Sequence, residues 1–315
     1  MHTLKVSRNG AGCRLDRFLR QSFPQEGLST FFAILRKKKV RVNGVVAKAP
    51  QLLNEGDEIT IYETLRTEAP AKAQGWGASA KFADPAFLET HFEIALETED
   101  FLVLNKPSGV ASQQGTGTRQ GETLTEMLWE WGRERGQDFK PTLAHRLDQE
   151  TSGLVVAALH GDVLRTLTRL LREHQMEKTY LALVKGPLKQ ERGTIRQALE
   201  RTDSARGSKM QAGPGKEAVT HYALQRRFKG FDLVKIRLET GRMHQIRAHF
   251  AALGHPLAGD TRYGDFALNR ALKKSAGLSR LFLHSSRLEF TYKGKRYVVE
   301  AKLPAELKSV LEKLP

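Results

Sequence analysis

Cysteine is nearly absent from this sequence of 315 residues, in which Cys13 is the single example. A lone cysteine excludes a disulfide within one chain and a thiolate-based metal site. This usage fits a reducing compartment, so we expect the protein in the cytoplasm. The N-terminal stretch MHTLKVSRNG holds no long apolar core, and no later run is long enough to cross a bilayer. We therefore expect neither a signal peptide nor contact with a membrane interior.

Motifs of several common enzyme classes are also missing. The sequence has no GxxxxGK[ST] phosphate loop, no HExxH and no GxSxG nucleophile elbow, and GTGTRQG at 115–121 does not match GxGxxG. His244 and His249 lie five residues apart on an expected helix, so they do not share a face, and no third ligand stands out. We therefore expect no metal site.

Positive charge, by contrast, is plentiful. The chain has 51 Lys and Arg residues against 35 Asp and Glu, a formal net charge of +16. This excess favours a polyanionic partner, usually nucleic acid or an acidic membrane surface, over a basic protein without such a partner. With 40% hydrophobic and 27% charged residues, the chain has the composition of an ordinary globular protein, and nothing suggests more than a monomer.

Residues 1–64 are predicted to form a small α/β domain. In RLDRFLRQSF, Leu15, Phe18 and Leu19 fall on one helical face. A second helix is expected to begin at Ser29, a favourable N-cap, and to run through TFFAILRKKK. Two strands, VRV and VVAK, are then expected to form a hairpin around an Asn-Gly turn, and EGDEITIYE alternates as a closing strand.

Residues 65–88 are predicted to be a linker, because they are rich in Ala, Gly and Pro and show no clear period. Trp76 and Phe82 within this segment are either stray aromatics or anchors on a neighbouring surface.

Residues 89–315 are predicted to form an α+β domain with a mixed, largely antiparallel sheet, because strand patterns outnumber helical ones and hairpins are common. The expected helices are TLTEMLWEWGRERG, DVLRTLTRLLREH with Asp162 as its N-cap, and MHQIRAHFAALG, which Gly254 ends. The expected strands are HFEIALE, DFLVLNKP, GLVVAAL, KTYLALV, FDLVKIRLE and a hairpin in SRLEFTYKGKRYVVEA.

Asp148 is the first candidate for chemistry. It lies in HRLDQETSGLVVAAL, directly before a polar turn and an apolar strand, so we expect it at the edge of the core. A carboxylate there needs a cationic partner to remain ionised, and Arg146, Arg242 and Arg247 are the candidates. The alternative interpretation is a turn aspartate that accepts hydrogen bonds from the backbone of Thr151.

The second basic motif, TGRMHQIRAH, contains Arg247. Helical spacing predicts that Met243, Ile246, Phe250 and Leu253 face the core. Arg247 is one residue past Ile246, so we expect it at the border of that face, with a solvated helix arginine as the alternative.

Six motifs in a fixed order resemble those of the RluA-type pseudouridine synthases: NKPSG, HRLDQETSG, KTYLALV, TGRMHQIRAH, GHPLAGDTRYG and LFLHSSRLEF. The resemblance covers about residues 89–312, and within the family the chain is most similar to the RluC-like branch that modifies large-subunit (23S) ribosomal RNA. The N-terminal domain resembles the αL RNA-binding domain. The loop VASQQGTGTRQGE departs from the histidine-glycine element of many relatives, so we expect it to contact the substrate and to influence the choice of target.

The resemblance implies a pseudouridine synthase fold with a central cleft and an enzyme that isomerises uridine in RNA without cofactor or metal. It implies that Asp148 is the catalytic residue, either as nucleophile or as the base that removes a ribose proton. Arg247 would pair with Asp148, and Tyr180 would stack on the target base and assist proton removal. Arg146 would fill the gap that the flipped-out uridine leaves in the RNA.

Further residues are expected to bind RNA or to line the pocket. Ile246 and Leu283 would form the pocket floor, where core packing is an equally good account, and Lys106-Pro107 would shape a loop at the cleft. Basic residues of the N-terminal domain would grip phosphates with little regard to sequence. These residues are Arg14, Arg17, Arg36, Lys37, Lys38, Lys39 and Arg41.

Two other functions stay open at this point. One is the same chemistry on transfer RNA, and the other is a non-catalytic RNA-binding factor in ribosome assembly. The joint presence of Asp148, Tyr180 and Arg247 argues against the second of these.

Overall fold

The computed structural model describes residues 1–65, 92–115, 118, 121–137, 139–202 and 209–315. The predicted linker lies outside the described residues, apart from Leu65, and so do Trp76 and Phe82.

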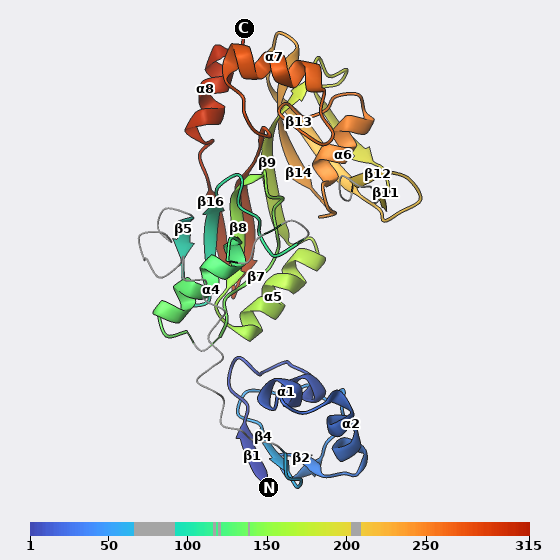
Figure 1. Cartoon of the computed structure of the whole chain (residues 1–315), viewed down its shortest axis with the longest axis vertical. Helices are drawn as coiled ribbons and strands as arrows, with labels where there is room; N and C mark the ends of the chain where they lie inside the picture. The colour runs from blue at the N-terminus through green and yellow to red at the C-terminus, as the bar shows by residue number, and fades with distance from the viewer. Residues whose placement is uncertain (66–91, 116–117, 119–120, 138, 203–208) are drawn as a thin grey trace.

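The N-terminal residues form a four-stranded antiparallel sheet with two helices (Figure 1). Leu15 and Leu19 of the first helix are buried as predicted, and Phe18 packs partly against the same core. The predicted hairpin is present, and both of its turn residues have positive φ, 50° at Asn43 and 77° at Gly44. The strand order is β1-β4-β2-β3. The elements are β1 (His2–Lys5), α1 (Leu15–Ser22), α2 (Leu28–Arg36), β2 (Val40–Val42), β3 (Val45–Val46) and β4 (Glu58–Ile61).

Two details of this region differ from expectation. The sequence pattern did not reveal β1, which completes the sheet by pairing with β4. The prediction that Ser29 caps α2 is wrong, because the N-cap is Gly27, whose carbonyl already accepts from the Thr30 N–H. The helix ends at Arg36, and Lys38 takes a positive φ of 57°, so the basic run leads out of the helix.

A ten-stranded sheet forms the frame of the rest of the chain, and it is mixed and largely antiparallel, as predicted. The path of the sheet is β10-β13-β14-β9-β15-β8-β6-β5, with β16 paired to β15 and β7 to β8. These strands are β5 (Glu93–Glu97), β6 (Phe101–Lys106), β7 (Thr142–Leu143), β8 (Ser152–Ala158), β9 (Met176–Lys185), β10 (Arg192–Arg196), β13 (Val219–Phe228), β14 (Phe231–Leu238), β15 (Leu283–Tyr292) and β16 (Lys295–Glu300). A separate pair consists of β11 (Leu199–Thr202) and β12 (Lys209–Ala212).

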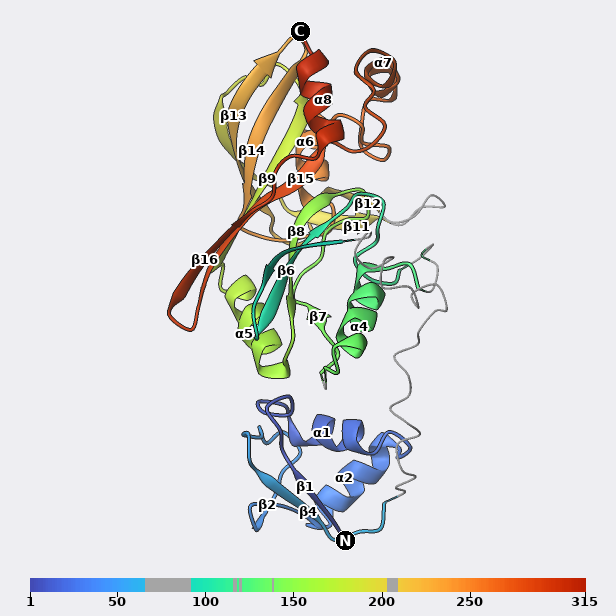
Figure 2. The ribbon, with the colours of Figure 1, turned by 90° about the vertical axis from the view of Figure 1, so that its left-hand side faces the viewer.

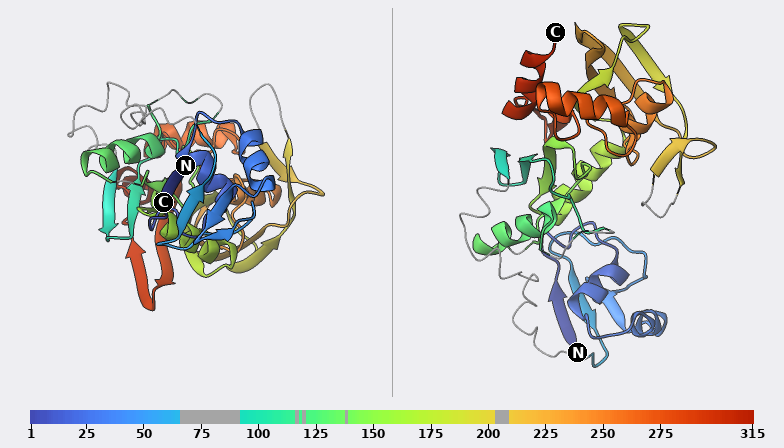
Figure 3. Two further views of the ribbon diagram at one scale, coloured as in Figure 1. Left: turned by 90° about the horizontal axis from the view of Figure 1, so that it is seen from below. Right: turned by 45° about the horizontal axis from the view of Figure 1, so that its top comes forward.

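Helices cover both faces of this sheet. Residues of α4 and α6 share one hydrophobic cluster with β6, β8, β9 and β14. On the opposite face, α5 packs beside the β15–β16 hairpin, and α7 and α8 pack together near the C-terminus (Figures 2 and 3). The helices are α4 (Leu124–Glu134), α5 (Gly161–Arg172), α6 (Gln245–Ala252), α7 (Phe266–Ala276) and α8 (Ala305–Lys313).

The predicted core faces of these helices are largely confirmed. The predicted apolar residues of α4 are buried, and its N-terminus carries a capping box of Thr123 and Glu126. In α6, Ile246 and Phe250 are buried as predicted, whereas Met243 precedes the helix and is only partly buried. The prediction for Leu253 is wrong, because this residue is the C-cap just past the helix and is 45% exposed.

The prediction that Asp162 caps α5 is also wrong, because His160 holds the N-cap position. Asp162 instead faces Arg8 of the N-terminal domain, whose Nε lies 3.3 Å from its carboxylate. Arg8 also pairs through Nη2 with Asp100, and Lys293 reaches the same carboxylate at 2.9 Å. The two pairs of Arg8 join the N-terminal region to the end of the sheet that carries α5 (Figure 1).

The two halves of the large sheet meet where β8 and β15 run parallel, at Ser152–Gly153 and His284–Ser285. Gly153 has a φ of +109°, and a Cβ built there would lie 2.2 Å from the Ser285 carbonyl oxygen. This close approach of two backbones fixes where the segment before β8 leaves the sheet.

Gly153→Ala is expected to destabilise the protein by roughly 3–5 kcal/mol, because backbone strain and a backbone clash act together. Gly230→Ala is the matched control, since Gly230 has a φ of +81° but open space around its Cβ position. The control should cost only about 1–2 kcal/mol. Urea unfolding of both variants measures the difference, and equal losses would contradict the proposed backbone contact.

Candidate active site

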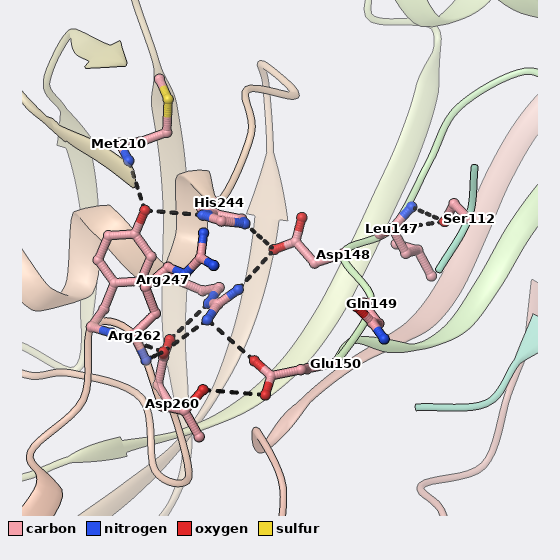
Figure 4. Close-up of polar contacts among 12 residues, drawn as sticks. Ser112, Leu147, Asp148, Gln149, Glu150, Met210, His244, Arg247, Asp260 and Arg262 are labelled. Carbon is pink, nitrogen blue, oxygen red and sulfur yellow. Dashed lines mark hydrogen bonds and ion pairs between the residues drawn. The ribbon is translucent and has the colours of Figure 1, made fainter. Parts of the chain in front are cut away.

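Asp148 lies in the turn that connects β7 to β8. The Thr151 N–H donates to the main-chain carbonyl of Asp148 at 3.1 Å, so the backbone closes this turn and the carboxylate is not its cap. Leu147 anchors the preceding residues, since its N–H and carbonyl both bond the Ser112 hydroxyl, at 3.0 and 2.7 Å. The Asp148 side chain is 21% exposed and stands at the opening of the cleft (Figure 4).

Lys106 holds the turn that carries Asp148 through hydrogen bonds. This side chain is fully buried, and its Nζ donates to the carbonyls of Pro107, Val110 and Gln149 at 2.7–3.1 Å. Desolvation lowers the pKa of Lys106 to about 7, against the opposing charge of Asp148. Lys106 thus joins the loop that follows it to the turn that carries Asp148. That Lys106-Pro107 shapes a loop at the cleft stays a prediction.

Arg247 lies at the centre of the site, and its closest partner is Asp260. Its Nε and Nη2 donate to the two Asp260 oxygens, both at 2.8 Å, in a bidentate pair. The same carboxylate accepts the backbone N–H groups of Arg262 and Tyr263 at 2.8 and 2.9 Å. The Arg247 side chain is only 4% exposed, so the expectation that it lies at the border of the helix face is wrong. The bidentate pair with Asp260 offsets its complete burial.

From this anchored position the guanidinium reaches two other carboxylates. Its Nη1 lies 3.5 Å from Asp148 Oδ2, and its Nη2 lies 3.3 Å from Glu150. The predicted pairing of Arg247 with Asp148 is therefore present, although it is looser than the pair with Asp260. Figure 4 shows the second oxygen of Asp148 directed away from the guanidinium.

Hydrogen bonds and charge keep the pair of Arg247 and Asp260 ionised against the effect of burial. Burial disfavours both charged forms, but hydrogen bonding and the charge of Asp260 outweigh it and raise the pKa of Arg247. Burial likewise opposes ionisation of Asp260, and the bonds from Arg247 outweigh it and lower the pKa of that carboxyl. A permanent positive charge therefore lies beside Asp148 at any physiological pH.

His244 approaches Asp148 from the other side, with Nε2 at 3.9 Å from Oδ2. Its backbone is left-handed, with a φ of 50°. The Tyr263 hydroxyl accepts the Met210 N–H at 2.7 Å and shares a hydrogen bond with His244 Nδ1 at 3.0 Å. Burial lowers the pKa of His244, which favours the neutral ring.

A cavity of about 250 Å³ adjoins this carboxylate. Six residues that were predicted to act at the cleft all line this cavity: Arg146, Asp148, Tyr180, Ile246, Arg247 and Leu283. Lys178 and Arg242 also line it and add positive charge. The cavity combines an apolar floor with a carboxylate on one wall, as a site for a small aromatic ring requires.

Tyr180 is buried on β9, with 6% of its surface exposed. Burial, and then the charge of Asp148, raise the pKa of Tyr180 well above its ordinary value. The phenol therefore stays protonated at neutral pH, so Tyr180 acts as a ring and a neutral hydroxyl and not as a preformed phenolate base.

Asp260, Glu150 and His244 are the members of this site that sequence reasoning did not single out. The sequence could have indicated Asp260, because this residue lies in GHPLAGDTRYG, one of the motifs that carry the family resemblance. Only the fold shows that its carboxylate is fully buried and therefore needs a partner as strong as Arg247.

The basic residues predicted in the N-terminal domain do not line this cavity. Arg17, Arg36, Lys37 and Lys38 are exposed on that domain. The others have local partners: Arg14 pairs with Asp16, Lys39 with Glu63, and Arg41 lies over the Tyr62 ring at 5.6 Å. The structure thus brings the six predicted residues of the cavity together, and the predicted basic residues of the N-terminal region lie away from them.

Comparison with known proteins accounts for this arrangement. Residues 100–252 match the family described as RNA pseudouridylate synthase. The chain is 36% identical to "Ribosomal large subunit pseudouridine synthase C" of Haemophilus ducreyi, over 98% of this chain and 94% of that protein. The protein of the same name from Escherichia coli K12 is also 36% identical, over 98% and 95%. The chain belongs to the RNA pseudouridylate synthase family.

Solved structures agree with this membership. Human RNA Pseudouridylate Synthase Domain Containing 1 is 28% identical with a TM-score of 0.57, and the match covers 70% of this chain and 86% of that one. Human RNA Pseudouridylate Synthase Domain Containing 4 has a TM-score of 0.60 at 23% identity, over 72% and 94%, which shows the shared fold. The resemblance predicted from the six motifs, and the fold and enzyme class that it implied, are confirmed.

Neither a metal cluster nor a membrane-spanning helix occurs among the described residues. No group of three or more His, Cys, Asp or Glu side chains among them is placed to hold a metal ion. None of the helices in this part of the chain is long and apolar enough to cross a membrane.

Asp260→Asn is expected to destabilise the protein by about 3–5 kcal/mol, because it leaves a buried guanidinium without its charged partner. Asp16→Asn, which breaks the pair with Arg14 at the N-terminal domain surface, should cost far less, because exposed ion pairs contribute little. Denaturant unfolding at pH 7 measures both, and similar losses for the two variants would contradict the central role of the pair of Arg247 and Asp260.

The same pair predicts a pH dependence. Because the pKa of Asp260 is lowered by folding, its stabilising contribution is present above about pH 4, the ordinary aspartate value, and is lost as the pH falls through the folded-state pKa. The wild type should therefore lose stability in this acid range more steeply than Asp260→Asn. Parallel curves of unfolding free energy against pH would contradict the ionised pair.

Proposed function

We propose that this enzyme converts specific uridines of large-subunit (23S) ribosomal RNA to pseudouridine, with Asp148 as its catalytic carboxylate. The observation that carries the proposal is the position of that carboxylate, between a buried guanidinium 3.5 Å away and a cavity of about 250 Å³. The names of the relatives at 36% identity support the large ribosomal subunit as the source of the RNA.

The reaction is an isomerisation, so the cavity must hold a detached uracil and return it to the same ribose. The bond between ribose C1′ and N1 breaks, the ring rotates, and a bond forms between C1′ and C5. C5 then loses its hydrogen as a proton to solvent and N1 takes up a proton, so that the product has the same composition as uridine. Tyr180 and Leu283 would pack on the ring, with Ile246 beneath, so that it can turn without leaving the site. Exclusion of water by this apolar floor protects the intermediate state.

Asp148 has two possible roles at this step. As a nucleophile it would form a covalent bond to the ribose or the base, and as a base it would remove a ribose proton. Both roles need an ionised carboxylate with an accessible oxygen. The positive charge of Arg247 lies 3.5 Å from one oxygen of this carboxylate, and a side chain exposed to 21% leaves the other oxygen for the substrate.

The target nucleotide must leave the base stack before Asp148 can reach its sugar. Arg146 is exposed at the mouth of the cavity, two residues before Asp148, and is positioned to enter the space that the uridine vacates. Its guanidinium can stack on the neighbouring bases while it contacts the RNA backbone.

The N-terminal domain would hold RNA remote from the reacting base. The largely exposed corner from Arg36 to Lys39, with Arg14, Arg17 and Arg41, supplies positive charge for phosphates. We further propose that the enzyme acts as a monomer and that it acts in the cytoplasm, since a single cysteine fits a reducing compartment.

Asp148→Asn is expected to abolish isomerisation, at least ~10³-fold, while RNA affinity changes little, because the variant keeps the shape of the turn. Glu150→Gln is the matched control, since Glu150 is the other carboxylate that Arg247 reaches across the cleft. The control should retain measurable turnover. Tritium release from RNA labelled at uridine C5 measures activity, and robust release by Asp148→Asn would refute the catalytic assignment.

Mapping of pseudouridine in total RNA, by carbodiimide sequencing with and without the gene, tests the substrate. Loss of modification in 23S RNA is expected. Loss confined to transfer RNA would redirect the proposal, and full rescue by Asp148→Asn would favour a non-catalytic assembly factor.

Replacement of Lys37 and Lys38 by alanine is expected to weaken RNA binding uniformly across sequences. The slope of log affinity against log salt should fall by about one for each phosphate that is no longer neutralised. Lys273 and Lys274 are the matched control, being exposed lysines near the end of another helix, α7. Equal salt slopes for the two double variants would contradict a phosphate-binding role for the N-terminal corner.

A further inference from the structure

A second cavity, of about 570 Å³, opens on the other side of Asp148. We propose that it binds the base of one nucleotide next to the target uridine, unstacked from its strand and read along its hydrogen-bonding edge. This inference rests on the proposed function and adds to it a second nucleotide subsite.

The location of the cavity argues for an adjacent nucleotide. It shares Arg146, Leu147, Asp148, His244 and Arg247 with the uridine cavity, so the two cavities adjoin along one wall. An RNA chain that delivers a uridine to one side of this wall has its next residue within reach of the other side.

The remaining lining is rich in neutral groups that form hydrogen bonds. Gln113, Gln114 and Gln149 contribute three amides, and Thr261 contributes a hydroxyl. An amide offers donors and an acceptor in one plane, which matches the edge of a nucleobase. Two of these amides have defined orientations, because Gln114 Nε2 donates to Glu126 and Gln149 Nε2 donates to the Gly109 carbonyl, both at 2.9 Å.

The charges that line the cavity are mixed and do not single out a phosphate as its occupant. Three arginines, Arg146, Arg247 and Arg262, line it, so a phosphate would find positive charge there, but it would also face two carboxylates, Asp148 and Glu150. Arg247 already contacts both of these groups, and the Thr261 hydroxyl contacts the other Glu150 oxygen at 3.3 Å. A neutral base avoids this repulsion, which costs energy in a partly desolvated site.

The wall of the cavity is joined to the catalytic turn. Gly109 and Gln149 exchange a second hydrogen bond, from the Gly109 N–H to the Gln149 carbonyl at 2.9 Å. Ser112 ties the same loop to Leu147, and Figure 4 shows this contact beside Asp148. A base seated in this cavity would therefore help to hold the turn that carries the reacting carboxylate, which couples recognition to chemistry.

The test combines side-chain truncation with base removal in a double-mutant cycle. Gln113→Ala together with Gln149→Ala is assayed for isomerisation of an RNA fragment that the wild type modifies, and of matched RNAs with an abasic residue on the 5′ or the 3′ side of the target. We expect the double variant to lose about tenfold or more in kcat/KM on intact RNA. With one of the two abasic RNAs, the kcat/KM of the wild type should fall by a similar factor.

When the double variant acts on the abasic RNA that lowers the wild-type rate, kcat/KM should fall little further than with either change alone. Gln225→Ala, an exposed glutamine on β13, is the control and should leave all rates as in the wild type. Additive losses with both abasic RNAs, or no loss in the variant, would overturn the subsite while the proposed function stands. A wild type that isomerises no RNA would overturn the proposed function, and the subsite with it.

Discussion

The bidentate contact between Arg247 and Asp260 is the interaction on which the rest of the site depends. A guanidinium that is 4% exposed is costly to bury, and only a fully buried carboxylate with fixed geometry offsets that cost. The loop after α6 places Asp260 beneath the helix, where the backbone amides of Arg262 and Tyr263 hold it in turn. Because the guanidinium cannot move, its remaining N–H groups define where Asp148 and Glu150 must lie.

The two sides of the cleft contribute different things. The segment from His244 to Tyr263 supplies the positive charge of Arg247 and an imidazole that lies 3.9 Å from the Asp148 carboxylate. The turn before β8 supplies the carboxylate, and Lys106 and Ser112 hold that turn to a neighbouring loop through backbone carbonyls. The parallel contact of β8 with β15 joins the sides where the backbones are closest. The position of one oxygen atom thus depends on contacts from several parts of the sheet.

Local patterns predicted most of the elements. The Asn-Gly hairpin, the buried strand after Asp148 and the faces of α4 and α6 follow from spacing and turn chemistry. Helix starts were less predictable, because Ser29 and Asp162 are good caps in isolation while Gly27 and His160 hold the cap positions. In the second case a partner far away in sequence, Arg8, engages the carboxylate.

In the candidate site, too, contacts between residues distant in sequence could not be predicted from local patterns. Ordered motifs were sufficient to name Asp148, Tyr180 and Arg247, and these side chains converge on one cavity. The partner of Arg247 was not evident, since the helical pattern placed that arginine at a surface border, where Asp148 alone would have sufficed. Burial depends on what packs over a residue from elsewhere in the chain, and no local spacing contains that information.

The loop from Gly109 to Gly115 forms one wall of the second cavity. Within it, Gly109 and Ser112 hold the turn that carries Asp148, whereas the residues that hold Arg247 lie on other elements. Side chains on that loop that do not face Leu147 or Gln149 could therefore be exchanged without disturbing the ion pairs. A descendant of this enzyme could acquire new RNA targets through changes in a few loop codons while it inherits the reaction intact. Substrate range and chemistry are, in this architecture, separately evolvable.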